Sequence, residues 1–600
     1  MINHILTVIQ VSSILILLTI IPFYIVSKKN HKNFLELIFN NFTRGIFWLL
    51  VISFVLLLIK AYNTVTLFSV YFFIIIVIGV INIKNVIPKF KNIKFKENIL
   101  VFLFLLLIIL GASYIMFYMP FNHADYGGGD SFENTYRARV MESNTLFKGY
   151  LAPGYFLFLA SLHKFSNLFG DSVFNFYNIT RFIGPILGIF FLIAIYAVSR
   201  KIIKNPYLAL IPTSFLGLIT TSPLPLLSEF SKIFHLTFDQ LIISFEQNLA
   251  LVFMIIVLYY AIAIILEKNN WYNLLLFQAL TIVFMTHLLI FGIATLMLLA
   301  LVLAGFIHKT ISFKKAVKIS IISFFALIPE IIHNALIFLS KTLDPSLKRN
   351  LILLKITPFT SLIRSYSHVL LIVAISVFSL YRREKEEKKY VTFILIFSIL
   401  LMPLAIFYAP YRLWPFFAII TALTLGIFIK DILNLQIFDK LRKFKYHLTI
   451  TVLVFLVILL LAFPLTPITR EDTLFPSTIN EGFVKSTLKI YENYPLDEST
   501  FYAGKTLYYE GISLVGLDTD WKDLEAITGA NPKDYVPKAK HEFVYIDKEL
   551  NPILEIWLPK VRLGYGNYEE IQKKAKDWIK NYEKARVVYE DEKFIAYIIS

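Results

Sequence analysis

Residues 98–155 read NILVFLFLLLIILGASYIMFYMPFNHADYGGGDSFENTYRARVMESNTLFKGYLAPGY, an apolar run that changes into a polar, acidic segment. The apolar part is long enough to cross the hydrocarbon core of a bilayer as a helix. Directly after it come carboxylates, arginines and a run of three glycines. Because acidic side chains are costly at membrane depth, such a cluster beside a long apolar helix indicates a functional site. We call residues 119–178 the island.

The rest of the chain is mostly apolar. Of its 600 residues, 57% are hydrophobic and only 16% are charged, which excludes an ordinary soluble globular protein. The absence of cysteine excludes disulfides and thiolate metal sites. Apolar runs of membrane-spanning length recur and predict a polytopic α-helical membrane protein with about fourteen spans. The expected spans are 5–26, 45–62, 65–83, 98–118, 179–199, 206–222, 248–266, 272–287, 289–307, 316–338, 366–381, 390–408, 412–430 and 447–464.

The positive charge of the chain is unevenly distributed. Residues 465–600 carry 18 Lys and Arg against 23 Asp and Glu, a net charge of −5. The remainder carries 40 basic against 18 acidic residues, a net charge of +22, and the excess lies in short loops between apolar runs. This pattern is typical of membrane orientation and not of a nucleic-acid surface. The basic loops are Lys28 to Lys32, Lys84 to Lys96, Arg200 to Lys204, Lys309 to Lys315, Arg382 to Lys389 and Lys430 to Lys445.

These six basic loops fall on alternate connections, so the positive-inside rule places all of them in the cytoplasm. The same alternation places both termini and the island outside. The assignment of loops to the two sides of the membrane depends on residues 153–169, because this segment is apolar enough to form a helix. If they spanned the membrane, every later loop would change sides, so we expect an amphipathic or re-entrant segment lying at the outer surface.

The chain divides into three regions. Residues 1–97 form N-terminal transmembrane helices, and 98–464 form a transmembrane module that contains the island as its first outer loop. Residues 465–600 are richer in Lys, Asp, Glu and Tyr, which predicts a mixed α/β domain outside the membrane. Within this domain we expect strands at 500–503 and 543–546, a surface helix at 568–584 and a hairpin at 586–599.

The island begins with residues suited to a binding site. Three glycines at 127–129 let a ligand approach the backbone closely and free Asp130 to cap a helix. On that helix Asp130, Glu133 and Arg137 would share one face, and Arg139 would follow half a turn later. A carboxylate at a helix start with two arginines along the helix can place a base beside a bound phosphate. The alternative to a binding site is a purely structural role, in which Asp130 caps the helix and Glu133 forms a solvated ion pair with Arg137.

The pattern resembles the GT-C superfamily of membrane glycosyltransferases, which includes protein O-mannosyltransferases, aminoarabinose transferases and oligosaccharyltransferase catalytic subunits. The similar features are an apolar helix, an outer loop opening with an acidic residue, an Arg-Ala pair and the Pro-Gly-Tyr segment that ends at Tyr155. The resemblance continues through FGDSVFNFYNITRFIGPILGIFFLIAIYAVSR at 169–200 and returns in YAPYRLWPFFAIITAL at 408–423. The tryptophan-rich acceptor motif of the oligosaccharyltransferases is absent from residues 465–600.

The resemblance implies an inverting transfer of a sugar from a polyprenyl-phosphate-linked donor to a glycan, lipid or protein acceptor on the outer face. Asp130 would be the general base that takes the acceptor proton. The leaving lipid phosphate needs cationic partners, and Arg137, Arg181 and Arg412 are the candidates because guanidinium binds phosphate bidentately. For Arg181 and Arg412 the alternative is snorkelling toward the headgroups. Asp125, Glu133 and Tyr155 complete the expected substrate-binding set.

Other interpretations stay open. His123, Asp125 and Asp130 could hold a divalent ion, although two carboxylates and one imidazole are a thin ligand set. A polysaccharide polymerase or ligase would also use outer arginines on a lipid pyrophosphate. A transporter or flippase for lipid-linked glycans would show internal repeats and broken helices at the midplane, and the sequence shows neither. A catalytically inactive scaffold with an outer sensor domain is the remaining alternative.

Overall fold

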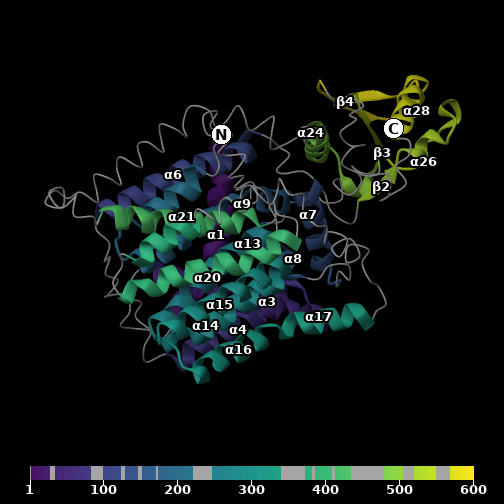
Figure 1. Cartoon of the computed structure of the whole chain (residues 1–600). Helices are drawn as coiled ribbons and strands as arrows, with labels where there is room; N and C mark the ends of the chain where they lie inside the picture. The colour runs from purple at the N-terminus through teal and green to yellow at the C-terminus, as the bar shows by residue number, and fades with distance from the viewer. Residues whose placement is uncertain are drawn as a thin grey trace.

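A bundle of long apolar helices and a small C-terminal α/β domain make up the molecule (Figure 1). The computed structural model describes residues 2–26, 34–82, 99–122, 129–145, 152–170, 173–219, 246–339, 372–381, 385–407, 413–433, 479–504, 519–548, 568–592 and 594–599. The α-helices of the bundle are α1 (Ile2–Thr19), α2 (Ile21–Val26), α3 (Phe34–Leu58), α4 (Thr64–Ile81), α6 (Ile99–Asn122), α7 (Gly129–Glu142), α8 (Gly154–Ser166), α9 (Val173–Ile203), α10 (Leu210–Ser214), α13 (Glu246–Ala261), α14 (Asn273–Thr286), α15 (Leu288–Ile307), α16 (Phe313–Ala326), α17 (Ile328–Leu339), α20 (Lys385–Phe407) and α21 (Trp414–Leu433).

Within the described residues, eight helices are long and apolar enough to cross a membrane, as expected of a multi-pass membrane protein. They are His4–Val26, Phe34–Leu58, Thr64–Ile81, Phe176–Ile203, Gln247–Leu266, Leu288–Ile307, Phe313–His333 and Pro415–Leu433. Each overlaps a span expected from the sequence. Five further expected spans fall on α6, on α10 with the π-helical turn η3 (Phe215–Ile219), on α14, on the helix at 372–381 and on α20. The expected span at 447–464 lies outside the described residues.

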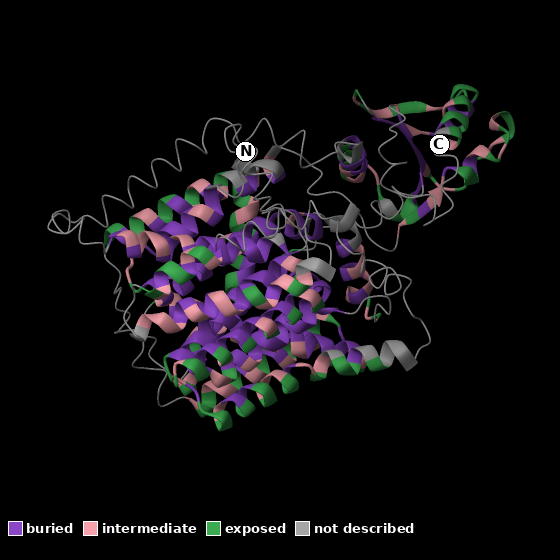
Figure 2. Cartoon of the chain, in the orientation of Figure 1, coloured by how far each residue is buried: buried purple, intermediate pink, exposed green. Residues whose placement is uncertain are grey.

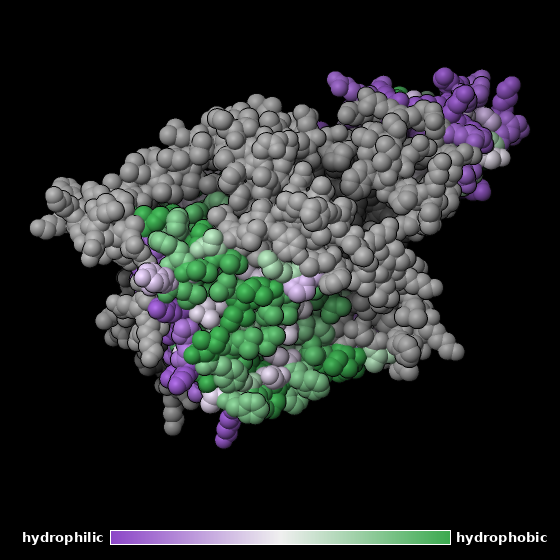
Figure 3. Space-filling view, viewed as in Figure 1, coloured by the Kyte–Doolittle hydropathy of each residue, from purple (hydrophilic) through white to green (hydrophobic). Residues whose placement is uncertain are grey.

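The surface of the bundle fits a lipid environment. Figure 2 shows buried residues filling its interior, and Figure 3 shows apolar side chains covering much of its exposed flank. Exposed apolar residues follow α6 and α16, among them Leu103, Leu107, Leu110, Ile321 and Phe324. The described surface of the C-terminal domain in the same view is mostly hydrophilic. Because a contiguous apolar surface of this kind is rare on soluble proteins, it supports burial in a bilayer.

Basic side chains from separate loops meet at one end of the bundle, which we call the basic end. Lys430 donates to the backbone oxygen of Ile203, 2.8 Å away, and pairs with Glu387 at 2.9 Å. Lys201 pairs with Glu267 at 2.6 Å. The alternation of basic loops in the sequence predicts one shared side for them, and these contacts agree with that prediction.

The carbonyl groups at the end of α13 are part of this basic end. There the helix widens into a π-helical turn, η5 (Ile262–Leu266), which leaves carbonyl groups unbonded within the helix. Lys315 donates to the oxygen of Ile264 at 2.6 Å, and Lys389 donates to that of Leu266 at 2.8 Å. The ammonium groups also face the negative end of the helix dipole.

The opposite end holds α7 and α8, and we call it the island end. The side chain of Asn144, just after α7, accepts a hydrogen bond from the backbone N–H of Tyr62, which lies in the turn between α3 and α4. Ser161 in α8 bonds to Ser53 at 2.9 Å, one to two turns before the end of α3. At its other end α8 begins against Met285, in the last turn of α14. Both ends of α8 therefore meet the same end of the bundle, so this helix lies across the bundle and not along it.

The prediction of an amphipathic surface segment at 153–169 is wrong for residues 154–166, although Leu168 and Phe169 just after them are exposed. Every residue of α8, from Gly154 to Ser166, is buried. Its 13 residues extend about 20 Å, less than the hydrocarbon core that a spanning helix must cross. The two polar residues that suggested an amphipathic surface segment, His163 and Lys164, each bond to Glu142 inside the protein. α8 is a buried helix of the island end.

The C-terminal domain is a five-stranded mixed sheet with α24 on one face and α28 on the other. Strand order is β2-β1-β3-β5-β4; β1 is parallel to β2 and β3, while β5 is antiparallel to β3 and β4. The expected strands and hairpin are confirmed, and β2 is an additional strand. Its elements are α24 (Ile479–Asn493), β1 (Ser499–Ala503), β2 (Asp520–Asp523), α26 (Glu525–Thr528), β3 (His541–Asp547), α28 (Tyr568–Lys580), β4 (Arg586–Glu590) and β5 (Phe594–Ile598).

Alternation along the strands builds the two cores of this domain. Phe501 and Phe543 point to one face, where they pack with Phe483 of α24. Their neighbours Tyr502 and Val544 point to the other face, where they pack with α28. Successive side chains of a strand point to opposite faces, so one apolar strand fills both layers.

Candidate functional site

The predicted helix after the three glycines is present as α7, which begins at Gly129. Asp130 is therefore in its first turn and not the residue before it. A carboxylate in a first helical turn is favoured by the helix dipole. The side chains of Asp130 and Glu133, and all of Asp125 and Arg412, lie outside the described residues. Their expected roles stay predictions.

The two arginines of α7 lie against aromatic rings of neighbouring helices. The guanidinium carbon of Arg137 is 5.5 Å from the ring centre of Phe156 in α8. That of Arg139 is 4.6 Å from the ring centre of Phe176 in α9, and Arg139 is only 8% exposed. Such contacts hold a guanidinium in place while its charge is retained. The sequence paired Arg139 with Arg137 beside a possible phosphate but named only Arg137 among the substrate-binding residues, and the burial of Arg139 could not be foreseen without Phe176.

Arg181 lies just over two turns into α9 and is also 8% exposed. Its guanidinium carbon is 5.5 Å from the ring centre of Tyr177 and 5.3 Å from that of Phe182. The Phe182 ring also lies 6.2 Å from His4 in α1 and 5.9 Å from Phe121 at the end of α6. The start of α1, the end of α6 and the start of α9 thus meet around Arg181. The alternative of snorkelling toward headgroups does not fit a guanidinium this buried.

A second polar group lies at the end of α7. Glu142 and His163 are joined by a 2.6 Å contact between the carboxylate and Nδ1. Lys164 donates to the backbone oxygen of Glu142 at 3.0 Å, and its ammonium lies 4.9 Å from the ring centre of Tyr62. Burial lowers the pKa of Lys164, and the Glu142 carboxylate acts in the opposite direction. None of these contacts was expected, because the partners are distant in sequence.

Tyr155 is fully buried in α8, with its ring centre 6.4 Å from that of Phe156 and 6.3 Å from that of Phe158. The preceding Gly154 is needed for this packing. A Cβ at Gly154 would lie 2.7 Å from the backbone oxygen of Met285, which is too close for any other residue. The Pro-Gly-Tyr segment therefore seats α8 against α14.

The C-terminal domain joins the island end through aromatic residues. Tyr177 of α9 is 3% exposed and belongs to the same apolar cluster as Phe483 of α24, and Tyr136 of α7 packs against that cluster. Tyr136 precedes Arg137, and Tyr177 is one helical turn before Arg181. The two helices that carry the arginines, α7 and α9, thus each contribute a tyrosine to this cluster, and both lie on the side of the bundle nearest α24 (Figure 1).

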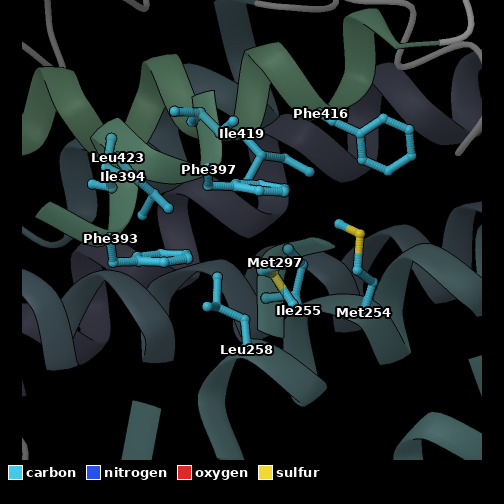
Figure 4. Close-up of a pocket in the computed structure, with 11 residues that line it drawn as sticks. Met254, Ile255, Leu258, Met297, Phe393, Ile394, Phe397, Phe416, Ile419 and Leu423 are labelled. Atoms are coloured by element: carbon cyan, nitrogen blue, oxygen red, sulfur yellow. The ribbon is translucent and has the colours of Figure 1, made fainter. Parts of the chain in front are cut away.

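Two other features do not add to this cluster. Among the described residues, no three His, Asp or Glu side chains lie close enough together to hold a metal ion. The three residues that could hold a divalent ion, His123, Asp125 and Asp130, fall outside the described side chains. An apolar pocket lies between α13, α15, α20 and α21, lined by residues such as Met254, Met297, Phe397, Phe416 and Leu423 (Figure 4). Its lining residues carry no group for chemistry.

The island end therefore combines three buried or half-buried arginines with aromatic rings and one histidine–carboxylate pair. Guanidinium groups held by rings can bind a phosphate without first losing much conformational freedom. Comparison of the sequence with protein-family models and with curated proteins gives no match. What the protein does is therefore inferred from the chemistry of the island end.

Proposed function

We propose that this protein is a membrane glycosyltransferase that moves a sugar from a polyprenyl-phosphate-linked donor to an acceptor on the outer face, with inversion. The observation that supports the proposal is the placement of three arginines at the island end: Arg137 and Arg139 on α7, the helix that carries Asp130, and Arg181 on α9. Phosphate is the ligand that arginines recognise bidentately. A lipid-linked phosphate would reach them from the flank of the bundle.

Asp130 supplies the second requirement of the reaction. The acceptor hydroxyl must lose its proton as its oxygen attacks the anomeric carbon, and a carboxylate within hydrogen-bond reach can take it. As the bond to the leaving oxygen breaks, negative charge builds on the lipid phosphate, where arginines stabilise it. Asp130 and Arg137 share one face of α7 because they are seven residues apart. One helix would then carry both the base and a phosphate partner.

The side of the membrane on which we place the reaction follows from the charges at the two ends of the bundle. Lys201, Lys315, Lys389 and Lys430 gather at the basic end, and the positive-inside rule assigns that end to the cytoplasm. The island end and the C-terminal domain in contact with it are then outside. Donors made of polyprenyl phosphate expose their sugar at this surface in the proposed reaction. The resemblance to GT-C enzymes points to the same side.

The test is sugar transfer by the full chain in proteoliposomes that contain polyprenyl-phosphate-linked sugar. Asp130→Asn should abolish turnover while donor binding is retained, because the base is lost and the arginines are not. Arg181→Gln should instead weaken donor binding. Asp534→Asn, in an exposed turn of the C-terminal domain, is the control that should behave like the unaltered protein. Unchanged turnover of Asp130→Asn would exclude the assignment of the base.

A further inference from the structure

The imidazole of His4 lies at the island end, although the sequence gave the N-terminal helices no part in the site. His4 is in the first turn of α1, and its ring centre is 5.7 Å from that of Phe121, with the two rings 26° from parallel. The ring centre of Phe182 in α9 lies 6.2 Å away. Rings from α6 and α9 therefore hold this imidazole in place.

The Phe182 ring beside His4 also contacts Arg181. The guanidinium carbon of Arg181 is 5.3 Å from the centre of that ring, and its charge acts on the His4 imidazole. Two groups that can carry positive charge are thus brought together from α1 and α9. A bound anion offsets the repulsion between such groups, so their proximity favours an anionic ligand.

His4 differs from Arg181 in its accessibility. Arg181 is 8% exposed, whereas His4 is only half-buried. No hydrogen bond of the His4 ring nitrogens is present within the described residues. An imidazole donates one hydrogen bond when neutral and two when protonated, so it can bind a phosphate oxygen in either state. His4 is therefore available to a ligand bound at Arg181.

The first turn of α1 borders the lipid-facing flank of the bundle. Ile5 and Leu6, the next two residues, are 42% and 59% exposed, and Leu110 and Tyr114 of α6 are also exposed. Exposed apolar side chains on helices of spanning length are expected where lipid covers the protein. A phosphate carried by a lipid can approach His4 from the bilayer, with its hydrocarbon chain left in the membrane.

We propose that His4 is a phosphate-binding residue of the donor site, which contacts the phosphate of the polyprenyl-phosphate-linked sugar together with Arg181. The proposal rests on the proposed function and adds a residue that lies outside the island. Arg181 supplies a permanent charge, and His4 donates a hydrogen bond from a neighbouring helix. His4 takes no proton from the acceptor, and that role stays with Asp130. The helix α1 is then part of the donor site.

Binding of polyprenyl phosphate to the full chain in phosphatidylcholine nanodiscs tests this contact. His4→Phe keeps a ring beside Phe121 and Phe182 but removes both nitrogens, so the packing is retained. We expect its Kd for polyprenyl phosphate to rise about 10-fold or more, the size of a lost hydrogen bond to a charged group. Ile5→Phe adds a ring at an exposed position of the same turn and is the matched control, which should bind like the unaltered protein. A Kd of His4→Phe within about twofold of the unaltered value would overturn the proposal.

Two further ligands show whether the contact is made to the donor phosphate. Polyprenol, which has the chain without the phosphate, should bind equally to His4→Phe and to the unaltered protein. Equal weakening for polyprenol would show that His4 acts through packing and would overturn the proposal. Phosphatidylglycerol carries a phosphate on a different lipid, and an excess of it should leave the binding of polyprenyl phosphate unchanged. Displacement by phosphatidylglycerol would assign His4 to the headgroups of the bilayer and would also overturn the proposal.

A double variant measures whether His4 and Arg181 act on one phosphate. Residues that share a ligand are coupled, so His4→Phe with Arg181→Gln should weaken binding of polyprenyl phosphate less than the product of the two single effects. A double effect equal to that product would refute a shared phosphate. In sugar transfer, His4→Phe should raise the donor KM and leave kcat within about twofold, as expected when binding alone is lost. A fall in kcat with an unchanged KM would refute the binding role.

This proposal and the proposed function fail in different ways. If the chain transfers sugar and His4→Phe binds polyprenyl phosphate normally, the glycosyltransferase stands and the role of His4 does not. If His4→Phe shows the expected loss of polyprenyl phosphate binding but the unaltered chain transfers no sugar, the phosphate-binding role of His4 stands and the transferase fails.

Discussion

Tyr177 of α9 and Phe483 of α24 are buried in one aromatic cluster, which joins the C-terminal domain to the helix that carries Arg181. The cluster includes Phe501, Trp521 and Phe543 of the sheet. Aromatic contacts of this kind contribute about 0.5–1.5 kcal/mol beyond the burial of area. A displacement of the C-terminal domain would therefore be transmitted to α9 through this cluster.

Truncating residues of this cluster should loosen the attachment of the domain to α9. Tyr177→Ala and Phe483→Ala should each lower sugar transfer, and the double variant should lose less than the sum of the two, because both residues belong to one cluster. Transfer measured for the two single variants and the double variant gives the coupling. Leu168→Ala, an exposed apolar residue before α9, is the control. Strictly additive losses would show that the two residues act independently.

Gly154 should be intolerant of any side chain. A Cβ there would lie 2.7 Å from the backbone oxygen of Met285, so Gly154→Ala should displace α8 from α14 and cost about 1–3 kcal/mol. Gly292→Ala is the matched control, because a Cβ at that position has no atom within 4 Å. Thermal denaturation of both variants in detergent checks the difference. Equal stability of the two would contradict the seating of α8 on Met285.

The sequence predicted the long helices well because membrane thickness sets their length. It did not predict the position of α8. A run such as GYFLFLASLHKFS looks like a surface helix because His163 and Lys164 are polar, and the partner that satisfies both is Glu142, which lies 21 and 22 residues earlier. Pairing across a loop leaves no periodic signal. The helix could be predicted, but its burial could not.

The C-terminal domain also contains an element that the sequence alone did not predict. The strands at Ser499–Ala503 and His541–Asp547 are apolar and were expected, whereas β2 has the polar sequence DWKD and was not. Its pairing with β1, which aligns Phe501 with Trp521, makes it a strand. In the island, α7 was predicted from its composition, but the burial of Arg139 depends on Phe176, which a single sequence does not place nearby.

Lys430 should stabilise the basic end. Its ammonium bridges the carbonyl of Ile203 and the carboxylate of Glu387, so Lys430→Met removes two charge-assisted bonds and leaves Glu387 without this partner. We expect a loss of about 1–3 kcal/mol, seen as a lower unfolding temperature in detergent. Lys574→Met is the control, because its pair with Glu570 is more than half exposed on the lysine side and exposed pairs contribute little. A comparable effect of the two would show that the bridge adds no stability.

High pH should destabilise the C-terminal domain. Burial, together with the hydrogen bond to Glu542, raises the pKa of Tyr535 above its ordinary value. The folded state therefore holds this proton more tightly than the unfolded state, and its contribution is present below about pH 10 and is lost as the pH rises beyond it. Hydrogen exchange of β3 should accelerate above that pH.

The variant Tyr535→Phe separates this effect from general alkaline unfolding. It removes one of the donors to buried Glu542, whose other partners include the N–H groups of Lys538 and Ala539. Exchange of β3 should already be faster at neutral pH, by the equivalent of about 1–3 kcal/mol, and should depend less on alkaline pH. Tyr589→Phe, whose hydroxyl bonds to Asp591 at the hairpin, is the control. An unchanged pH dependence in Tyr535→Phe would rule out this tyrosine as the cause.

Glycosyl transfer itself is tested most directly with a polyprenyl-phosphate-linked sugar that is labelled in its sugar, in proteoliposomes with the full chain and an acceptor on the island side. We expect label to pass to the acceptor with inverted anomeric configuration and free polyprenyl phosphate to be released, and we expect Asp130→Asn to stop both. Movement of intact labelled donor across the bilayer without transfer would identify a flippase and refute the proposed transferase.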